Sequence, residues 1–318
     1  MRSRAGGPRT QLRICTELLV APHQTLQELA EALPKEMRGD VVIVGSLAAA
    51  VRFFPPESEQ AVRTKDIDCL LTPRLRALTS GRQATESLMA RGWKMRPDDK
   101  WGKPGNADTS ELELPLVRLV PPGGGEWFLE LLSAPAATQT EARELQRLVT
   151  LHGHFVLCSF RFLALAEFAP LSTTHGLKIA RPEMMALANL LHHPTIRAEK
   201  MSGLIGDRRI KRSNKDLGRV LALAYLAERE SESALESWPV QWLDALRKIF
   251  PDESDGLQRN LGTGLEELLS DSHRDDLEEA QHTCIAGLLA GYRISLPALR
   301  ATGRRLIEEV IRPVRNKR

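Results

Sequence analysis

The sequence VVIVGSLAAAVRFFPPESEQAVRTKDIDCLL, residues 41–71, decides the fold expected for this chain. Its β-branched run Val41–Val44 predicts a buried strand, and Gly45-Ser46 follow it directly. A helix-favouring segment comes next and ends at Pro55-Pro56, because proline cannot continue a helix. A second apolar run carries Asp66 and Asp68. The stretch therefore predicts a strand, a tight turn, a helix, a loop and an acidic strand.

The two aspartates of this stretch indicate a cation site beside a phosphate site. Side chains alternate along a strand, so Asp66 and Asp68 project to one face. Neighbouring carboxylates repel each other, and Mg²⁺, which prefers oxygen ligands and phosphates, removes that repulsion. Gly45 and Ser46 begin a helix, whose N-terminus offers free N–H groups to phosphate, and Ser46 suits the N-cap position. Phosphoryl or nucleotidyl transfer is the chemistry that this pattern favours.

Gly45-Ser46 and Asp66-Ile67-Asp68 resemble the two signature motifs of the nucleotidyltransferase superfamily that includes DNA polymerase β. With Thr64-Lys65 before the acidic pair, the motif is most similar to that of the bacterial branch of abortive-infection and MenT-type toxin nucleotidyltransferases. The close match covers residues 41–71. The resemblance implies that the Gly-Ser turn holds a nucleoside triphosphate and that the acidic pair holds two Mg²⁺ ions. Lys65 is a further nucleotide-binding candidate.

The same family places a third metal carboxylate on a later strand, and Glu130 in Phe128–Leu132 is the best match here. Glu113 and Glu126 are weaker alternatives. Asp is commoner than Glu at that place, and a solvated residue on a half-exposed strand is the alternative role for Glu130. If Glu130 is the third ligand, it also accepts the proton of the attacking hydroxyl, directly or through water.

A second candidate segment runs from Lys200 to Lys215 and reads KMSGLIGDRRIKRSNK. The family resemblance continues weakly in Arg181-Pro182-Glu183 and in Lys215-Asp216, which predicts nucleotide-binding roles for Lys215 and Asp216. Asn189 stands where relatives carry a triphosphate-binding lysine, so Lys178 and Lys200 are the candidate substitutes. Asp216 could instead cap the helix that begins at Ser213.

Basic residues crowd the same segment and suggest attraction to phosphate, either of the triphosphate or of an RNA backbone. A solvated loop is the alternative. The RNA-binding candidates are Arg208, Arg209, Lys211 and Arg212.

Length and composition predict an α+β protein in two parts. The 318 residues favour two domains or one large one. The resemblance implies a nucleotidyltransferase-fold domain with a mixed sheet and flanking helices over residues 1–150, and the fading of strand signals predicts an all-helical domain over residues 151–318, which the resemblance implies contributes to nucleotide and acceptor binding. With 42% hydrophobic residues the chain can bury a sizeable core. No apolar run reaches membrane-spanning length, so no membrane partner is expected. The scattered cysteines predict buried, reduced thiols and a cytoplasmic protein: Cys15, Cys69, Cys158 and Cys284.

Further elements follow from periodicity and turn residues. Residues 1–12 read as a mobile leader, and Leu12–Leu33 as one or two amphipathic helices. Residues Leu112–Val120 and Trp127–Leu132 predict a hairpin, and Thr138–Leu151 predicts a helix. The remaining helices are expected at 82–91, with Gly92 as its C′ residue, and at 182–193, 213–230, 239–250, 256–269, 274–292 and 296–311.

These observations together predict a Mg²⁺-dependent nucleotidyltransferase that moves a nucleotide from a nucleoside triphosphate to a hydroxyl. The toxin resemblance implies an RNA acceptor such as the tRNA 3′ end, and an antitoxin protein as a partner. Two alternatives stay open. The acceptor could be a small molecule or a protein, or the chain could be a non-catalytic nucleotide- or RNA-binding module on this scaffold. The last alternative is disfavoured because the chain retains both motifs, Gly45-Ser46 and the pair Asp66 and Asp68.

Overall fold

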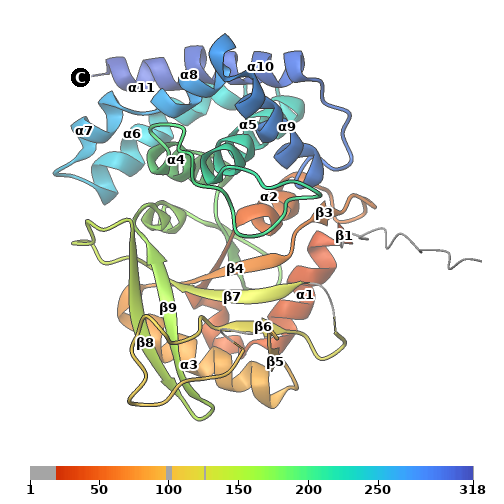
Figure 1. Cartoon of the computed structure of the whole chain (residues 1–318), viewed down its shortest axis with the longest axis vertical. Helices are drawn as coiled ribbons and strands as arrows, with labels where there is room; N and C mark the ends of the chain where they lie inside the picture. The colour runs from red at the N-terminus through yellow and green to blue at the C-terminus, as the bar shows by residue number, and fades with distance from the viewer. Residues whose placement is uncertain (1–18, 98–101, 125–126, 318) are drawn as a thin grey trace, which may run out of the picture.

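The computed structural model describes residues 19–97, 102–124 and 127–317 (Figure 1). Within them, nine strands form one mixed sheet with the order β10-β11-β2-β4-β7-β6-β5, and β9 pairs with β7 and with β8. A separate two-stranded pair joins β1 (Leu19–Val20) to β3 (Val62–Arg63). The strands of the sheet are β2 (Val41–Val44), β4 (Asp66–Leu71), β5 (Lys94–Met95), β6 (Arg118–Val120), β7 (Phe128–Ser133), β8 (Arg143–Thr150), β9 (Gly153–Phe160), β10 (Leu171–Ser172) and β11 (Lys178–Ile179).

Helices flank the sheet and then make up the C-terminal part of the chain, which lies above the sheet in Figure 1. The first three are α1 (Pro22–Ala32), α2 (Gly45–Phe53) and α3 (Arg74–Ala90). The C-terminal helices are α4 (Pro182–His192), α5 (Arg212–Glu230), α6 (Trp238–Ile249), α7 (Ser254–Arg259), α8 (Thr263–Leu269), α9 (Arg274–Ala286), α10 (Leu296–Arg305) and α11 (Arg312–Asn316), with a π-helical turn at Leu306–Ile311. Short 3₁₀ helices lie at Lys35–Asp40, Arg161–Glu167, Ala234–Ser237 and Asp271–His273.

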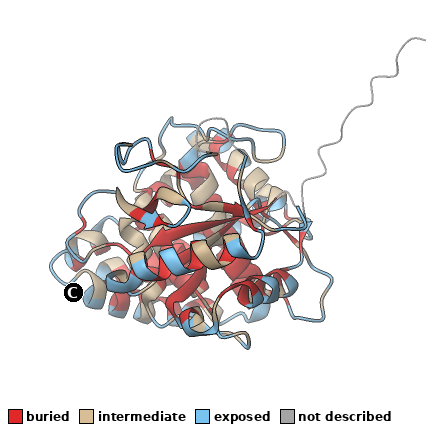
Figure 2. Cartoon of the chain, turned by 90° about the horizontal axis from the view of Figure 1, so that it is seen from below, coloured by how far each residue is buried: buried red, intermediate tan, exposed pale blue. Residues whose placement is uncertain are grey.

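The centre of the sheet consists of β2, β4 and β7, and Figure 2 shows this region as buried. All four residues of β2 are buried, as expected for a strand covered on both faces. β4 runs antiparallel to β2 and parallel to β7. The predicted strand–turn–helix–strand unit of residues 41–71 is therefore present, and it lies in the middle of the sheet.

The C-terminal helices pack around α5, which contacts both α4 and α9. At the α5–α9 contact, a side chain on Gly218 would meet the backbone oxygen of Ala280 at 2.7 Å, so the two backbones approach as closely as glycine permits. The helix α6 buries Trp242 completely, and its indole Nε1 donates a hydrogen bond to the backbone oxygen of Glu183 at 2.9 Å. These contacts tie α4, α5, α6 and α9 into one core.

Four predictions of secondary structure are corrected. Thr138–Leu151 is not a helix but contains β8, which pairs along its whole length with β9. α3 begins at Arg74 and is longer than predicted, although Gly92 has the expected left-handed φ of 86°. Only the last part of Leu112–Val120 is a strand, and it forms the expected antiparallel pair with β7. The predicted helix 256–269 is two helices, which Gly262 separates with a φ of 77°.

The sheet extends beyond the predicted boundary at residue 150. The β8–β9 hairpin spans that residue, and β11 pairs with β2 in the sheet centre. The run of helices without intervening strands of the sheet begins with α4 at Pro182, after the last described strand, β11, ends at Ile179. Predictions for residues 1–18, including Cys15, and for Glu126 lie outside the described residues.

Candidate functional site

The pairing of β4 with β7 brings the three predicted carboxylates to one face of the sheet. Asp68 lies opposite Glu130, and Asp66 lies opposite Phe128. Directly paired residues of neighbouring strands point to the same face, and so do residues two apart on one strand. Asp66 and Asp68 are partly exposed, whereas Glu130 is 9% exposed. Backbone hydrogen bonds of the central strands therefore fix these carboxylates relative to each other.

The turn between β2 and α2 lies against the same aspartates. Val44 pairs with Asp68, and Gly45 follows with a left-handed φ of 75°. A Cβ atom on Gly45 would stand 3.3 Å from Oδ2 of Asp68. The half-buried Ser46 is the next residue of α2, but Val44 holds the N-cap position, so the predicted capping role of Ser46 is wrong. The N-terminus of a helix thus adjoins the acidic pair.

The carboxylates differ in their electrostatic surroundings. Burial raises the pKa of Asp66, but the charges of Lys215 and Arg219 and a hydrogen bond from Thr64 outweigh it and hold the pKa below its ordinary value. Burial, and then the negative charges of Asp66 and Glu130, raise the pKa of Asp68 well above its ordinary value. The ionised form of Asp68 is therefore disfavoured by its surroundings, and added positive charge would stabilise it.

Lys215 and Arg219 come from α5, far away in the sequence. They are four residues apart and so lie on the same side of the helix. Both are half-buried, and both lower the pKa values of Asp66 and Asp216. The Gly45 turn and these two cations could bind phosphates next to the aspartates.

Asp216 is not a free carboxylate, because it accepts a hydrogen bond from Nε2 of His193 at 2.7 Å. Burial raises the pKa of Asp216, but this bond and the charges of Lys215 and Arg219 hold it below its usual range. His193 is 3% exposed and is the C-cap residue of α4, where its backbone nitrogen donates to the backbone oxygen of Asn189. The predicted capping role of Asp216 is wrong, since Lys211 is the N-cap residue of α5.

Glu130 has an arginine partner that sequence reasoning missed. Arg118 of β6 pairs with Glu130 across the sheet, and its Nε donates to Oε2 of Glu130 at 2.6 Å. Burial raises the pKa of Glu130, and Arg118 offsets that rise only in part. Arg143 of β8 is a second cation whose charge acts on Glu130.

The remaining lysine candidates lie away from the aspartates or make other contacts. Nζ of Lys178 donates to the backbone oxygen of Gly39 at 2.8 Å, before the start of β2 and at its far end from Gly45. Lys200 is exposed and bridges to Lys211 through the backbone. Lys65 is exposed immediately before β4, and its backbone oxygen accepts a hydrogen bond from Phe128. Of the predicted lysines, Lys215 acts on the aspartates.

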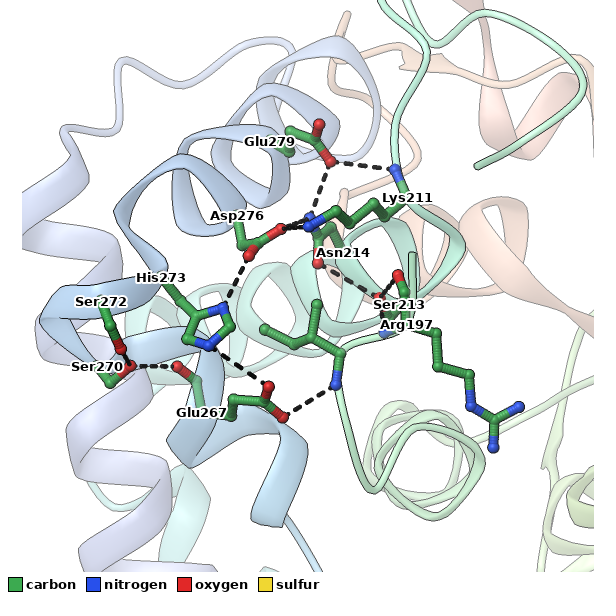
Figure 3. Close-up of polar contacts among 11 residues, drawn as sticks. Arg197, Lys211, Ser213, Asn214, Glu267, Ser270, Ser272, His273, Asp276 and Glu279 are labelled. Atoms are coloured by element: carbon green, nitrogen blue, oxygen red, sulfur yellow. Dashed lines mark hydrogen bonds and ion pairs between the residues drawn. The ribbon is translucent and has the colours of Figure 1, made fainter. Parts of the chain in front are cut away.

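Two acidic residues of α9 anchor the end of the predicted RNA-binding loop (Figure 3). Nζ of Lys211 lies 2.6 Å from Oδ1 of Asp276, which also accepts a hydrogen bond from Asn214. The backbone nitrogen of Lys211 donates to Glu279. Lys211 is therefore a structural anchor for the end of this loop.

The other loop cations have acidic neighbours too, but on the surface. Nε of Arg212 lies 3.6 Å from Glu199, and Nε of Arg208 lies 3.9 Å from Asp207. Arg209 is exposed. The loop's positive charge is thus partly balanced by its own carboxylates.

No signal local to the acidic pair pointed to Arg118, Arg143, Arg219 or His193. The spacing of Lys215 and Arg219 could have identified the second cation, because residues four apart share a helix face. Arg118 and Arg143 could be placed only after the strand register was known.

No group of three or more His, Cys, Asp or Glu side chains within residues 19–97, 102–124 and 127–317 is arranged as a ready metal-binding set. The donor chemistry nevertheless suits Mg²⁺, because partly exposed carboxylates lie on one face of the sheet, and the charges of Lys215 and Arg219 only partly offset the causes that raise the pKa of Asp68. Arg118 already occupies an oxygen of Glu130, so Asp66 and Asp68 fit the cation better than Glu130 does.

Comparisons with known proteins add no relationship. No protein-family model matches the chain, and the searches of curated proteins and of solved structures also find no match. In the described part of the chain, none of the helices combines the length and the apolar character needed to cross a bilayer. The described cysteines Cys69, Cys158 and Cys284 are buried free thiols, as the sequence predicted.

Proposed function

We propose that this protein is a Mg²⁺-dependent nucleotidyltransferase that joins a nucleotide to an acceptor hydroxyl, with RNA as the acceptor. The observation that carries the proposal is the strand register that sets Asp68 opposite Glu130, with Asp66 on the same face. The Gly45 turn is so close that a Cβ atom added there would stand 3.3 Å from Oδ2 of Asp68. The resemblance of Gly45-Ser46 and Asp66-Ile67-Asp68 to nucleotidyltransferase motifs gives the reaction class, and the toxin branch gives the acceptor class.

Each group of the site has a part in this reaction. Asp66 and Asp68 would hold Mg²⁺, which when bound neutralises phosphate charge and lowers the pKa of a hydroxyl. The N–H groups at the start of α2 would orient the triphosphate, assisted by Lys215 and Arg219 of α5. Glu130, whose pKa is raised, would accept the proton of the attacking hydroxyl, directly or through water. The chain's contribution is therefore mainly positioning and charge complementarity.

The proposal is tested by incubating the protein with Mg²⁺, each α-labelled nucleoside triphosphate in turn, and total tRNA. Labelled RNA and released pyrophosphate are measured. Asp66→Asn, which preserves size and removes the charge, should reduce transfer to background. The control is Asp244→Asn on the exposed face of α6, which should leave transfer unchanged. If Asp66→Asn still labels RNA as strongly as the parent protein, the proposed nucleotidyltransferase site is wrong.

One observation favours a second function, a nucleotide- or RNA-binding module without catalysis. The ion pair between Arg118 and Glu130 leaves the acidic group without a free third carboxylate. This function predicts tight nucleotide binding with no pyrophosphate release from any of the four nucleoside triphosphates. Calorimetric titration of the same protein sample used for the transfer assay separates the two functions.

A further inference from the structure

Two arginines extend the row of paired residues beyond Glu130. Arg118 pairs with Glu130 across β6 and β7, and the backbone nitrogen of Arg96 donates to the backbone oxygen of Arg118 at 2.8 Å. The guanidinium carbons of Arg96 and Arg118 lie 4.3 Å and 5.7 Å from the ring centroid of Phe128. Stacking on an aromatic ring holds a guanidinium in place while its N–H groups at the edge stay free to bond.

A third arginine, Arg143 of β8, acts on Glu130 through its charge. Nε of Arg143 donates to Sγ of Cys158 at 3.0 Å, and the charges of Arg143 and Arg118 both act on Cys158. Cys158 pairs with Leu132 of β7, two residues beyond Glu130, so it faces the same side of the sheet. We call Arg96, Arg118 and Arg143 the arginine cluster.

Among the described residues, one carboxylate forms an ion pair with the arginine cluster, which has three guanidinium groups. Glu130 forms an ion pair with Arg118, and no ion pair joins Arg96 or Arg143 to a carboxylate within the described residues. Arg143 is exposed and Arg96 is half-buried, so both can be reached by a ligand. Arg118 and Arg143 act on Glu130, and Arg96 stacks on the same Phe128 ring as Arg118. These guanidinium groups together make a site for an anion, because planar guanidinium forks match the oxygens of a phosphate.

The strand order separates this cluster from the proposed nucleotide groups. From β2 the sheet continues through β4, β7 and β6 to β5, so Gly45 lies on one side of the aspartates and Arg96 and Arg118 on the other. Lys215 and Arg219 act on Asp66 and Asp68, whereas Arg118 and Arg143 act on Glu130. The structure therefore offers two separate sets of cations. Lys215 and Arg219 are available to the phosphates of the nucleotide, and the arginine cluster is available to a phosphate of the acceptor.

We propose that the arginine cluster binds a backbone phosphate of the acceptor RNA and thereby aligns the RNA end with Asp66 and Asp68. This inference rests on the proposed function for the identity of the acceptor. It assigns acceptor binding to the sheet face, in place of the loop that carries Arg208 and Arg209. The cations of that loop are partly balanced by their own carboxylates, and Lys211 is committed to Asp276.

The test is binding of a labelled single-stranded RNA, followed by fluorescence anisotropy at increasing salt and without nucleoside triphosphate. The variant is Arg96→Gln with Arg143→Gln, which leaves the Arg118–Glu130 pair intact. The matched control is Arg208→Gln with Arg209→Gln, because it removes the same charge from the loop. Each phosphate contact that is lost lowers the slope of log affinity against log salt by about 0.7, so the cluster variant should lower it by about 1.4.

Binding of the Mg²⁺–nucleotide complex is measured on the same variants by calorimetry. The inference predicts weaker RNA binding and unchanged nucleotide binding for the cluster variant. Weaker nucleotide binding with unchanged RNA binding would assign the cluster to the triphosphate and overturn the inference. Loss of RNA binding in the loop variant alone would overturn it too. Arg96→Lys with Arg143→Lys keeps the charge and should retain most of the salt slope, which distinguishes phosphate binding from a folding defect.

Because RNA binding is measured without transfer, this test is independent of the catalytic one. Failure of Asp66→Asn to reduce transfer would remove the proposed reaction and leave the binding result standing. Normal RNA binding by the cluster variant would remove the inference while transfer remained dependent on Asp66.

Discussion

Replacing Gly45 with alanine tests the turn that brings helix α2 to the aspartates. The backbone of Gly45 has a φ of 75°, and the new Cβ would stand 3.3 Å from Oδ2 of Asp68. A left-handed conformation costs a residue with a Cβ about 1–2 kcal/mol. The close contact adds to this cost, because Asp68 lies on a central strand and cannot move freely. We therefore expect Gly45→Ala to lower the free energy of unfolding by at least about 1–2 kcal/mol.

Urea denaturation followed by circular dichroism measures this change, with Gly39→Ala as the matched control. Gly39 is exposed, its φ lies outside the left-handed region, and a Cβ there would meet nothing within 4 Å. Alanine at a compatible position raises stability by about 0.4–1 kcal/mol through the unfolded state, so this control should be neutral or slightly more stable. Equal stability of Gly45→Ala and Gly39→Ala would refute the reasoning.

A double-mutant cycle divides the cost between backbone and contact. In an Asp68→Ala background the contact with Oδ2 is absent but the left-handed φ remains. Gly45→Ala should then cost less than in the parent protein, since residues in contact commonly couple by about 0.5–3 kcal/mol. An unchanged cost in that background would mean that the aspartate does not crowd this turn.

Three further predictions concern buried groups around the site. Without metal, Asp68→Asn should stabilise the protein at neutral pH and lose that advantage as the pH falls towards 3.8, because the raised pKa makes ionised Asp68 unfavourable in the fold. Asp216→Asn should destabilise it at neutral pH by about 1–3 kcal/mol, a difference that shrinks below pH 3.8 since the native pKa is lowered. Gly218→Ala should cost about 1–3 kcal/mol, because its Cβ would meet the backbone of Ala280. Urea denaturation across pH checks all three, and pH-independent differences would contradict the first two.

The parts of the fold that sequence predicted well are those with local signals. The β-branched run before Gly45 gave β2, and the alternation around Asp66 and Asp68 gave β4 with the correct face. Pro182 began α4 at the predicted residue, as proline at the first helical position should. In each case the residues that determine the element lie within it or directly beside it.

The wrong helix at 138–151 has a long-range cause. Its Glu, Arg, Gln and Leu residues favour a helix in isolation, and Leu145, Leu148 and Val149 have helical spacing. In the structure the segment pairs with β9 from Arg143 to Thr150, and Leu148 is buried. Tertiary pairing overrides helix propensity here, and this pairing also places Arg143 near Glu130. The role of Arg143 was missed for the same reason that β8 was missed, because both depend on the pairing with β9.

The two halves of the site are held by different kinds of structure, and this gives Gly218→Ala a functional consequence. Asp68, Glu130 and Arg118 are in register across three strands, where a slip of one residue would reverse every side chain. Lys215 and Arg219 depend instead on where α5 packs against α9. The substitution lies between these two cations and pushes α5 from Ala280.

Gly218→Ala should therefore weaken binding of the Mg²⁺–nucleotide complex and leave RNA binding at the arginine cluster unchanged. Gly256→Ala in α7 is the matched control, because its Cβ would meet only the end of Arg259, at 3.9 Å. Equal loss of both ligands would show that the two halves are coupled through the whole fold. Loss of neither would mean that α5 does not supply the cations for the nucleotide.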